Sequence, residues 1–486
     1  MGDSKLPADF AGKTIHMVGI KGTGMAALAE ILAAGKARLR GSDVAEVFYT
    51  DAILASLGIE VLPFDRGNVG EGIDLVIHSA AYARNVHPEL VAAEESGIPI
   101  LTYTEALGEL SRRYDSTGIA GVHGKTTTTA LSGTLLRGVG SSSTILAGSA
   151  VAGFGDRSTL ILGDRFFVAE TCEYKRHFLS FSPSRIVLTS VEPDHQDYYP
   201  DYESIRDAFL EYALSLPPRG LLIYCADDPG ASDVAGRARV ARPDLELVPY
   251  GWTAEGPWRL ESYGTGAERA EFRVSGFPET FRLRVPGRHV ALDATAALAL
   301  TDRLVRREFG VPLEGGRLAA AREALESFAG SRRRAEILGT ARGILFMDDY
   351  GHHPTAIRLT LEGIRDFYPD RRLVVDFMSH TYSRTAALLD GYADAFTAAD
   401  EVILHRIYAS ARERPDGSVT GRTLFERMSA RRPGVRYFEE PLDALDILKS
   451  ELGPGDLFLT LGAGDNFRLG RALYESIKAG EDTETP

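Results

Sequence analysis

One stretch of the sequence combines the residue types that bind a nucleotide phosphate, and it reads GIAGVHGKTTTT. A phosphate-binding loop needs a strand, a glycine turn with inward-pointing N–H groups, and a helix whose positive end starts at the lysine. Gly121 and Gly124 can form the turn. Lys125 can then contact the β- and γ-phosphates, and Thr126 can offer a hydroxyl to Mg²⁺. Because Ile119 stands where the usual pattern G-x-x-x-x-G-K-S/T has its first glycine, a glycine-rich turn with a surface lysine stays an alternative.

A second glycine-rich turn follows the apolar run IHMVGI near the N-terminus. Residues Gly22–Ala27 fit the pattern G-x-G-x-x-A, and Asp43 closes a second strand-like run about twenty residues later. This pattern is typical of a dinucleotide-binding fold, although its glycines could merely let a helix pack closely on a strand. Two phosphate-type turns in one chain indicate two phosphorylated ligands.

Acidic and histidine residues follow two strand-like runs that come after the lysine loop. Glu170 ends the run FFVAE, and Asp194 and His195 come shortly after IVLTS. A carboxylate or an imidazole at a strand end beside a phosphate loop can reach a Mg²⁺ that bridges the phosphates. Any one of these residues could instead be a cap, a turn or a surface group, but their shared position favours a metal site.

Alternating strands and helices must position these residues. Short runs rich in Val and Ile precede amphipathic stretches, as IHMVGI precedes GMAALAEILAA, LVIHSA precedes PELVAAEES and RLVVDF precedes RTAALLDGYADAF. This alternation predicts parallel sheets covered by helices. The runs WRLESYG, AEFRVSG and ETFRLRV instead follow one another with turn residues between them, which predicts an antiparallel excursion within a larger central domain.

The length of 486 residues suggests roughly two to four domains. The helical pattern stops at SRRYDSTG, which begins at Ser111, and again at FAGSRRRAE, which begins at Phe328. These two joints predict three domains, 1–113, 114–332 and 333–486.

The composition is that of a soluble globular chain, with 44% hydrophobic residues, 25% charged residues and a net charge of −14. This charge opposes broad binding to nucleic acid or to anionic membranes, and no apolar run approaches the length of a membrane span. Cys172 and Cys225 are too few for a disulfide framework, so a reducing cytoplasm fits best. The beginning, MGDSKLPADF, lacks the features of a signal peptide, and we expect it and the acidic end AGEDTETP to be disordered.

Ten motifs, in order along the whole chain, resemble those of the Mur ligase family. They read GIKGTGM, GSD, GVHGKTTTT, ETCE, EPDH, PGRH, SRRRAE, DDYGHHPT, SHTYSRT and GAGD. The family's phosphate loop usually reads GTHGKTTT, without the early glycine, so the resemblance identifies the lysine loop as a phosphate loop. It implies an α/β fold of three domains, which are Rossmann-like at the N-terminus, P-loop ATPase-like with a mixed sheet in the centre, and Rossmann-like at the C-terminus.

The resemblance also implies a reaction. UDP-N-acetylmuramate would bind to the first domain, ATP with Mg²⁺ to the central domain, and L-alanine to the last. The sugar-lactate carboxylate would attack the γ-phosphate of ATP, and the amine of L-alanine would displace phosphate from the resulting acyl phosphate to form an amide. The resemblance thus implies cytoplasmic synthesis of a peptidoglycan precursor, and we expect a monomer or weak homodimer without nucleic-acid or membrane partners.

The matching motifs assign site residues by resemblance. Catalysis is assigned to Lys125, Glu170, His195 and Arg384, and the metal to Thr126, Glu170 and His195. ATP is assigned to Gly121, Val122, His123, Gly124, Lys125, Thr126, Thr127, Arg333 and Asp349. The sugar nucleotide and the amino acid are assigned to Gly22, Thr23, Gly24, Met25, Ser42, Asp43, Ser79, His123, His352, His380 and Arg384.

Within the last set, His380 and Arg384 would receive the amino-acid carboxylate, because an arginine fork binds both oxygens. Plainer alternatives stay open for three features. Arg333 lies in a basic run that could be solvated, and Arg384 could cap or decorate the helix beginning at RTAALLDGY. The sequence HHP, with Pro354, could be an ordinary helix start.

The sequence departs from the family's motifs at several positions. Cys172 stands where the family often has an aspartate, which puts a metal role for that position in doubt. Val290 and Asp293 stand where the family tends to have asparagines that contact adenine. Thr381 stands where an arginine is common, which leaves Arg384 as the principal cation for the amino-acid carboxylate.

Three alternative functions stay open. A sister ligase attaches a whole tripeptide to the same UDP-sugar and shares the motif HHPTAI, but SHTYSRT and GAGD favour a ligase for a single amino acid. An NAD-dependent oxidoreductase would use the first glycine-rich turn, and a non-catalytic regulator would bind ATP without turnover.

Overall fold

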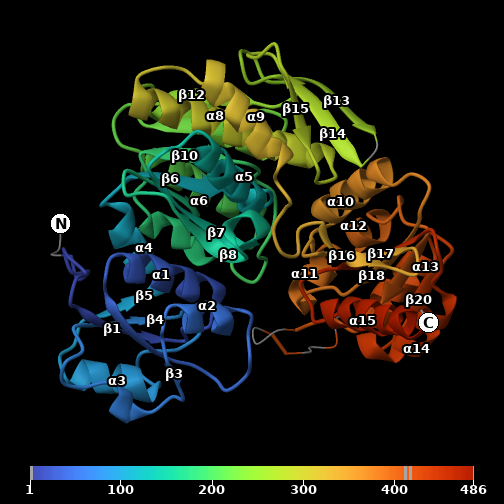
Figure 1. Ribbon diagram of the computed structural model, residues 1–486, viewed down its shortest axis with the longest axis horizontal. Coiled ribbons are helices and arrows are strands. Elements are labelled where there is room, and N and C mark those ends of the chain that lie inside the picture. The colour runs from blue at the N-terminus through green and yellow to red at the C-terminus, as the bar shows by residue number, and fades with distance from the viewer. Residues whose placement is uncertain (1–3, 267, 410–412, 415–416, 418, 485–486) are drawn as a thin grey trace. The chain divides into compact units, whose positions relative to one another are not determined.

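The computed structural model describes residues 4–266, 268–409, 413–414, 417 and 419–484, and for 482–484 only the backbone. The chain forms two compact units. The first contains Met1–Val191, Arg206–Pro249 and Ala296–Ala321, and the second contains Glu192–Ile205, Tyr250–Thr295 and Arg322–Pro486. Figure 1 labels many of the elements of both units.

The first unit begins with a five-stranded parallel sheet in the order β3-β2-β1-β4-β5. Its strands are β1 (Thr14–Val18), β2 (Arg38–Ser42), β3 (Val61–Leu62), β4 (Leu75–His78) and β5 (Ile100–Thr102). Its helices are α1 (Thr23–Ala34), α2 (Thr50–Ser56), η1 (Arg66–Asn68), α3 (Pro88–Glu95) and α4 (Tyr103–Ser111). The strand order, which reverses direction at β1, is that of a Rossmann-like fold, as predicted.

Both faces of this sheet are apolar, which explains why its strands read as nearly continuous hydrophobic runs. On one face, Met17 of β1 belongs to the same buried cluster as Leu28 of α1. On the other face, Val18 clusters with Leu90 of α3. Figure 1 shows α1 and α3 on opposite sides of the sheet. The α1 cluster also includes Phe167 of the next sheet, so the two sheets of the first unit share a core.

The next sheet has seven strands in the order β12-β11-β10-β6-β9-β7-β8. Its strands are β6 (Asp115–Ala120), β7 (Ser143–Val151), β8 (Arg157–Ile161), β9 (Phe166–Glu170), β10 (Arg185–Leu188), β11 (Leu221–Cys225) and β12 (Glu246–Tyr250). The accompanying helices are α5 (Lys125–Gly138), η2 (Ala152–Phe154), η3 (Tyr174–Ser180), α6 (Tyr202–Leu214), α7 (Pro229–Ala241), α8 (Arg288–Phe309) and α9 (Gly315–Glu326). Because β7 and β8 are antiparallel while β6, β9 and β10 run parallel, the sheet is mixed, as predicted.

The strand order brings the carboxyl ends of three strands together. β6 lies between β9 and β10 and pairs with both in parallel. The chain leaves β6 through α5 to β7, and it returns beside β6 only with β9. The loop after β6 therefore lies at a point where the strand order reverses, which is where open α/β sheets bind their ligands.

The second unit contains two sheets. Strands β13 (Leu260–Gly266), β14 (Arg269–Val274) and β15 (Thr280–Leu283) pair antiparallel, which confirms the excursion expected from three consecutive strand-like runs. A six-stranded sheet has the order β16-β17-β21-β18-β19-β20 and is parallel except for β16. Its strands are β16 (Glu336–Ala341), β17 (Ile344–Asp349), β18 (Arg372–Phe377), β19 (Glu401–Leu404), β20 (Val435–Tyr437) and β21 (Asp456–Leu461). Its helices are α10 (Pro354–Phe367), α11 (Tyr382–Ala387), α12 (Leu389–Asp394), α13 (Gly421–Ser429), η4 (Pro441–Ala444), α14 (Leu445–Glu451) and α15 (Phe467–Glu484).

Three local expectations were wrong. Leu6 is buried and its N–H donates to the Glu109 carboxylate, so the beginning of the chain is ordered from residue 4 onward. Helix α15 continues to Glu484, because its apolar face packs in the core of the six-stranded sheet; the expected disorder of 479–484 is therefore contradicted. Residues 1–3 and 485–486 lie outside the described residues. The stretch RTAALLDGY spans the end of α11 and the start of α12 instead of beginning one helix.

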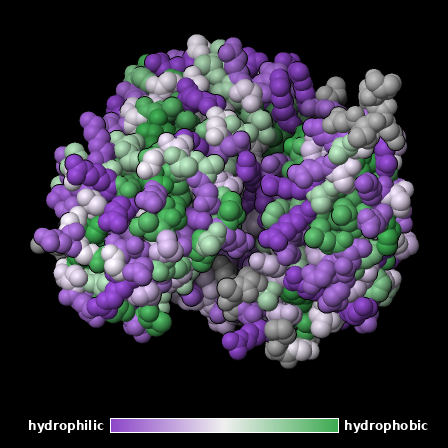
Figure 2. Space-filling view, turned by 60° about the horizontal axis from the view of Figure 1, so that its bottom comes forward, coloured by the Kyte–Doolittle hydropathy of each residue, from purple (hydrophilic) through white to green (hydrophobic). Residues whose placement is uncertain are grey.

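Two further observations concern the surface and the cysteines. On the face shown in Figure 2, hydrophobic residues gather in small groups separated by hydrophilic ones. Among the described helices, none combines the length and the apolar content that crossing a lipid bilayer requires. Cys172 is exposed and Cys225 is buried, and both are thiols without a disulfide.

Candidate active site

The lysine loop has the backbone of a phosphate-binding loop. Strand β6 ends at Ala120, and α5 begins at Lys125, as the sequence predicted. Gly124 precedes the helix in the left-handed region, with φ of 78°. Gly121 has φ of 141°, and a Cβ atom there would overlap with the Thr189 hydroxyl, so only glycine fits. The loop therefore keeps the glycines that let backbone N–H groups and a helix N-terminus meet an anion.

Two hydroxyl residues after β10 hold this loop in place. The Thr189 hydroxyl donates to the carbonyl of His123, and the N–H of His123 donates to Ser190 Oγ over 2.9 Å. The run IVLTS predicts only a strand, so the sequence alone gives Thr189 and Ser190 no role in the loop. Their position could have indicated this role, because they follow β10, which lies next to β6, the strand that leads into the loop.

The ammonium of Lys125 is held by its own loop and by a carboxylate. Lys125 Nζ donates to the carbonyl of Gly121 and lies 2.9 Å from Glu173 Oε2. Burial opposes the charged form, but the carboxylates of Glu173 and Glu170 more than offset it and raise the pKa of Lys125. The lysine is therefore a cation near neutral pH. Glu173 lies in the motif ETCE, but the sequence predicts no role for it.

Thr126 and Glu170 lie together beside the loop. Thr126 Oγ1 donates to Glu170 Oε2 over 2.8 Å, and the N–H of Gly148 donates to the same oxygen over 2.8 Å. A Cβ atom on Gly148 would overlap with this carboxylate. A hydroxyl and a carboxylate are the oxygen donors that Mg²⁺ prefers, so these two residues fit a magnesium ion. The third predicted ligand, His195, belongs to the second unit and has a positive φ of 55°.

The N-terminal glycine-rich turn joins β1 to α1. Gly22 precedes α1, which begins at Thr23, and Asp43 accepts the N–H of Lys21 over 2.7 Å. Asp43 thus holds the turn from the end of β2. Gly24 packs against the ring of Tyr103, where a Cβ atom would lie 2.8 Å from the ring carbon Cζ.

Other residues around the first sheet that were predicted to bind substrate are more buried than the turn. The side chain of Met25 is part of the buried core. The hydroxyl of Ser42 is fully buried and donates to Glu89 Oε2 over 2.5 Å, in a network with His16. Ser79 is half-buried just after β4. Met25 and Ser42 could therefore meet a ligand only through their backbone.

Arg333 and Asp349 lie together at the carboxyl end of β17. Arg333 pairs with Asp348 over 3.0 Å and donates to the carbonyl of Gly462 over 2.7 Å, which contradicts the alternative of a solvated basic residue. The Asp349 carboxylate accepts the N–H groups of Ala335 and Gly351 over 2.7 and 2.6 Å. Burial raises the pKa of Asp349, against the effect of Arg334 and these N–H groups.

His352, His380 and Arg384 gather in the same unit. The rings of His352 and His380 lie 6.1 Å apart, and Arg384 Nη1 lies 3.1 Å from His380 Nδ1. Burial and the charge of Arg384 lower the pKa of His352 well below its usual value, so this imidazole is neutral at pH 7. Arg384 is only 4% exposed and pairs with Asp194, which contradicts the alternative of an exposed arginine on a helix.

A small pocket lies beside this cluster. The carboxylate of Glu413 accepts the N–H groups of Tyr382 and Ser383 over 2.6 and 3.1 Å. Sequence reasoning did not single out Glu413. The pocket is lined by His195, Gln196, Asp197, Thr381, Ser383, Arg384 and Glu413.

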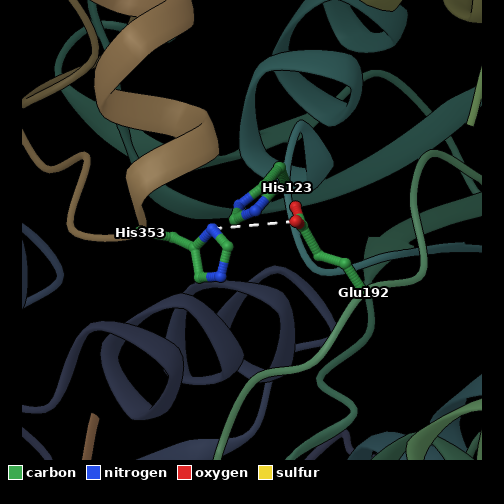
Figure 3. A group of neighbouring side chains, drawn as sticks. All are labelled: His123, Glu192 and His353. Atoms are coloured by element: carbon green, nitrogen blue, oxygen red, sulfur yellow. Dashed lines mark ion pairs between the residues drawn. The ribbon is translucent and has the colours of Figure 1, made fainter. Parts of the chain in front are cut away.

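Glu192, which follows β10, contacts the segment that contains the HHP motif. Figure 3 shows the side chains of Glu192 and His353 facing each other, with Glu192 Oε2 3.8 Å from His353 Nδ1. The same oxygen accepts the Thr355 hydroxyl over 3.0 Å. His353 is the N-cap of α10 and Pro354 its first residue, so the expectation that HHP could start a helix is confirmed.

The fold and these contacts define a class of protein. The chain has a phosphate loop at the reversal point of a mixed sheet, and it begins and ends with Rossmann-like sheets. These features define a P-loop nucleotide-binding α/β protein. The chain belongs to the Mur ligase family. The family's catalytic domain matches residues 14–115, its middle domain 119–301 and its glutamate ligase domain 333–464.

Relatives and solved structures agree with this membership. The chain is 53% identical over 475 residues to the UDP-N-acetylmuramate–L-alanine ligase of Treponema pallidum, covering 97% of this chain and 98% of that one. The enzyme of the same name from Desulfitobacterium hafniense is 40% identical over 463 residues, with 94% and 99% covered. The crystal structure of the UDP-N-acetylmuramate–alanine ligase of Thermotoga maritima superposes with a TM-score of 0.77 at 26% identity, covering 96% and 99%. A murein peptide ligase from Psychrobacter arcticus shares the fold, with a TM-score of 0.66 at 22% identity and 96% and 99% covered.

Proposed function

We propose that this chain is an ATP-dependent ligase that joins L-alanine to the lactate carboxylate of UDP-N-acetylmuramate, releasing ADP and phosphate, in peptidoglycan precursor synthesis. The observation that carries this proposal is the 53% identity to the Treponema pallidum ligase over nearly the full length of both chains. The phosphate loop at the reversal point of the central sheet supports ATP as the energy source. The alternative of an oxidoreductase rested on the N-terminal turn, which lies within the Mur ligase match.

The reaction has two bond-forming steps. A carboxylate oxygen of the sugar nucleotide attacks the γ-phosphorus of ATP, the bond to the β-phosphate oxygen breaks, and ADP leaves. The amine of L-alanine then attacks the carbonyl carbon of the acyl phosphate, and phosphate leaves with the bridging oxygen. Because two anions meet in the first step, the cation of Lys125 and the N–H groups of the loop stabilise the charge on the transferring phosphoryl group.

Magnesium fits the donors that surround the loop. Thr126 and Glu170, which already share a hydrogen bond, would hold the ion together with His195. When bound, Mg²⁺ supplies screening of the phosphate charge during phosphoryl transfer. Cys172 stands where the family often has an aspartate, so we assign no metal role to that position.

The remaining predicted residues divide between the ligands. ATP would be bound by residues of the loop and by two residues of the second unit: Gly121, Val122, His123, Gly124, Thr127, Arg333 and Asp349. The sugar nucleotide would be bound by residues around the first sheet: Gly22, Thr23, Gly24, Met25, Ser42, Asp43 and Ser79. His380 and Arg384 would bind the amino acid, and His123 and His352 would also contact the substrates. The domain boundaries 1–113, 114–332 and 333–486, the cytoplasmic location and a monomer or weak homodimer belong to the same proposal.

One assay tests the function. Phosphate release from ATP is measured with UDP-N-acetylmuramate and each of L-alanine, glycine, L-serine and the muropeptide tripeptide. We expect release only when ATP, the sugar nucleotide and a small L-amino acid are all present, with L-alanine the best. Turnover with the tripeptide but not with L-alanine would assign the chain to the ligase that recycles muropeptides.

A further inference from the structure

Asp194 binds two residues with one carboxylate oxygen. Its Oδ1 atom lies 2.9 Å from Arg384 Nε and 2.8 Å from Arg384 Nη2, and it accepts the N–H of His195 over 2.7 Å. Asp194 and Arg384 come from segments 190 residues apart in sequence and within the same compact unit. The oxygen therefore joins the predicted anchor of the amino acid to the backbone of a predicted metal ligand.

The contact between Asp194 and Arg384 determines which edge of the guanidinium faces away from Asp194. A guanidinium has five N–H donors arranged along its edges. Asp194 takes the edge formed by Nε and Nη2. The edge formed by Nη1 and Nη2 is turned away from Asp194, and it carries one N–H from each nitrogen. Two parallel N–H groups of this kind bind both oxygens of a carboxylate.

The surroundings favour a fixed and charged pair. Asp194 and Arg384 are each only 4% exposed, so neither can exchange its partner for bulk water. Two nitrogens of the guanidinium, Nε and Nη2, lie 2.9 and 2.8 Å from Asp194 Oδ1, which is the geometry of a charge-assisted ion pair. His380 Nδ1 lies 3.1 Å from Arg384 Nη1 and limits rotation of the guanidinium from another side.

The pocket shows where a ligand could reach this pair. Arg384 lines it, and so do His195 and Ser383. The residues that line this pocket do not include Asp194, so a small ligand there would meet Arg384 and not Asp194. Arg384 gives this pocket a cation that can bind a carboxylate, and the acidic residues Asp197 and Glu413, which line the same pocket, suit an ammonium group.

We propose that Asp194 is a positioning residue for the amino-acid substrate: it orients Arg384 so that the Nη1–Nη2 edge receives the α-carboxylate. Because the same Asp194 oxygen binds the backbone of His195, the carboxylate is held at a constant place relative to that residue. This inference rests on the proposed function and refines it, since it assigns the arginine's orientation to a residue that does not itself touch the substrate.

The test compares steady-state constants of the full-length enzyme and its Asp194→Asn variant. The amide has the same shape but lacks the charge, so the guanidinium loses its strongest constraint. We expect the KM for L-alanine to rise by on the order of tenfold or more, with the KM values for ATP and UDP-N-acetylmuramate unchanged. Asp194→Glu keeps the charge but displaces the arginine, and it should give an intermediate KM for L-alanine. Asp201→Asn is the matched control, because Asp201 lies exposed in the same segment.

The outcomes separate this inference from the proposed function. If the wild-type enzyme does not release phosphate with L-alanine, the proposed function fails. If it does, an unchanged KM for L-alanine in a folded Asp194→Asn variant overturns the positioning role. A lower KM would overturn it too, because Asp194 would then compete with the substrate, and an equal rise of all three KM values would show a structural role. If the asparagine variant does not fold, the glutamate variant gives the same comparison.

Discussion

Lys125 Nζ lies 2.9 Å from Glu173 Oε2, so the lysine of the phosphate loop is held by a carboxylate that follows the neighbouring strand β9. The side chains are 13% and 3% exposed, which shields the pair from water far more than a surface ion pair. The loop thus holds its cation in place before any nucleotide binds. A bound γ-phosphate would share this ammonium with Glu173.

Replacing this lysine should remove the main positive charge at the transferring phosphoryl group. We expect Lys125→Ala to lower kcat by on the order of a hundredfold or more, which is the scale seen when one preorganised electrostatic contact is lost. Phosphate release at saturating substrates measures the effect. The exposed Lys449→Ala is the control, and a kcat within a factor of two of wild type for Lys125→Ala would remove the lysine from the reaction.

The close approach of Gly148 to Glu170 predicts a second effect. In Gly148→Ala the new methyl group would overlap with the Glu170 carboxylate, so this carboxylate must move. If Glu170 holds Mg²⁺, we expect the Mg²⁺ concentration for half-maximal activity to rise by on the order of tenfold. Gly236→Ala is the matched control, because a Cβ atom at that position meets no neighbour.

His195 is the third predicted metal ligand, and it is tested in the same titration. We expect His195→Ala to raise the Mg²⁺ requirement in the same way as Gly148→Ala. A folded His195→Ala variant with an unchanged Mg²⁺ titration would exclude this histidine from the metal site. The Gly148→Ala prediction would stand independently of that result.

Arg384 is predicted to bind the carboxylate of L-alanine. Arg384→Ala removes a charge-assisted contact in a buried place, and we expect a loss of about 2–5 kcal/mol in kcat/KM for L-alanine. Arg384→Lys should recover only part, because an ammonium keeps the charge but lacks the fork. Kinetics with L-alanine varied at saturating ATP and sugar nucleotide measure both variants. Unchanged constants for L-alanine in Arg384→Ala would contradict the assignment.

A buried histidine predicts how the second unit responds to pH. His405 Nε2 lies 2.5 Å from Asp376 Oδ1, and His405 Nδ1 faces the carbonyl of Phe438, so the imidazolium suits both partners. Burial opposes this cation, but the charge and hydrogen bond of Asp376 more than offset it and raise the pKa of His405 above 6.5. Since the folded-state pKa exceeds the unfolded one, this stabilisation is complete below pH 6.5 and is lost as the pH rises through the folded-state value.

Hydrogen exchange measures this pH dependence locally. We expect the free energy of opening of amides in β18 and β19, corrected for intrinsic exchange rates, to fall as the pH rises above 6.5. The decline should be absent in His405→Gln. In His87→Gln it should persist, because His87 lies in the first unit and burial lowers its pKa. Equal pH slopes in wild type and His405→Gln would contradict the prediction.

Local patterns explain what the sequence could predict. The glycines before Lys125 and the threonines after it predict a strand, a turn and a helix in direct succession, and the structure has all three. Glu170 was identified because it ends an apolar run, and runs of this kind become parallel strands whose carboxyl ends meet at one edge. Three consecutive strand-like runs with turn residues between them likewise predicted the antiparallel strands β13, β14 and β15.

Contacts between distant segments explain what the sequence could not predict. Asp194 and Arg384 are 190 residues apart, so no spacing rule relates them. Leu6 is fixed by Glu109, 103 residues away, which is why the beginning of the chain was wrongly expected to be disordered. The acidic residues near the C-terminus suggested a solvated tail, but Leu473 and Ile477 pack in a core cluster and the helix continues past them. Ser42 was assigned to the substrates by resemblance, and nothing in the spacing predicted that its side chain completes a buried network with Glu89, which is 47 residues away.

The most direct test of the central claim follows the oxygen atoms of the new amide bond. UDP-N-acetylmuramate with both lactate carboxylate oxygens labelled as ¹⁸O is incubated with this enzyme, ATP, Mg²⁺ and L-alanine, and the released phosphate is analysed by mass spectrometry. Formation and aminolysis of an acyl phosphate predict that each phosphate carries one ¹⁸O atom and that the amide product retains the other. Phosphate without ¹⁸O, or labelled phosphate without an amide to L-alanine, would contradict the proposed ligase reaction.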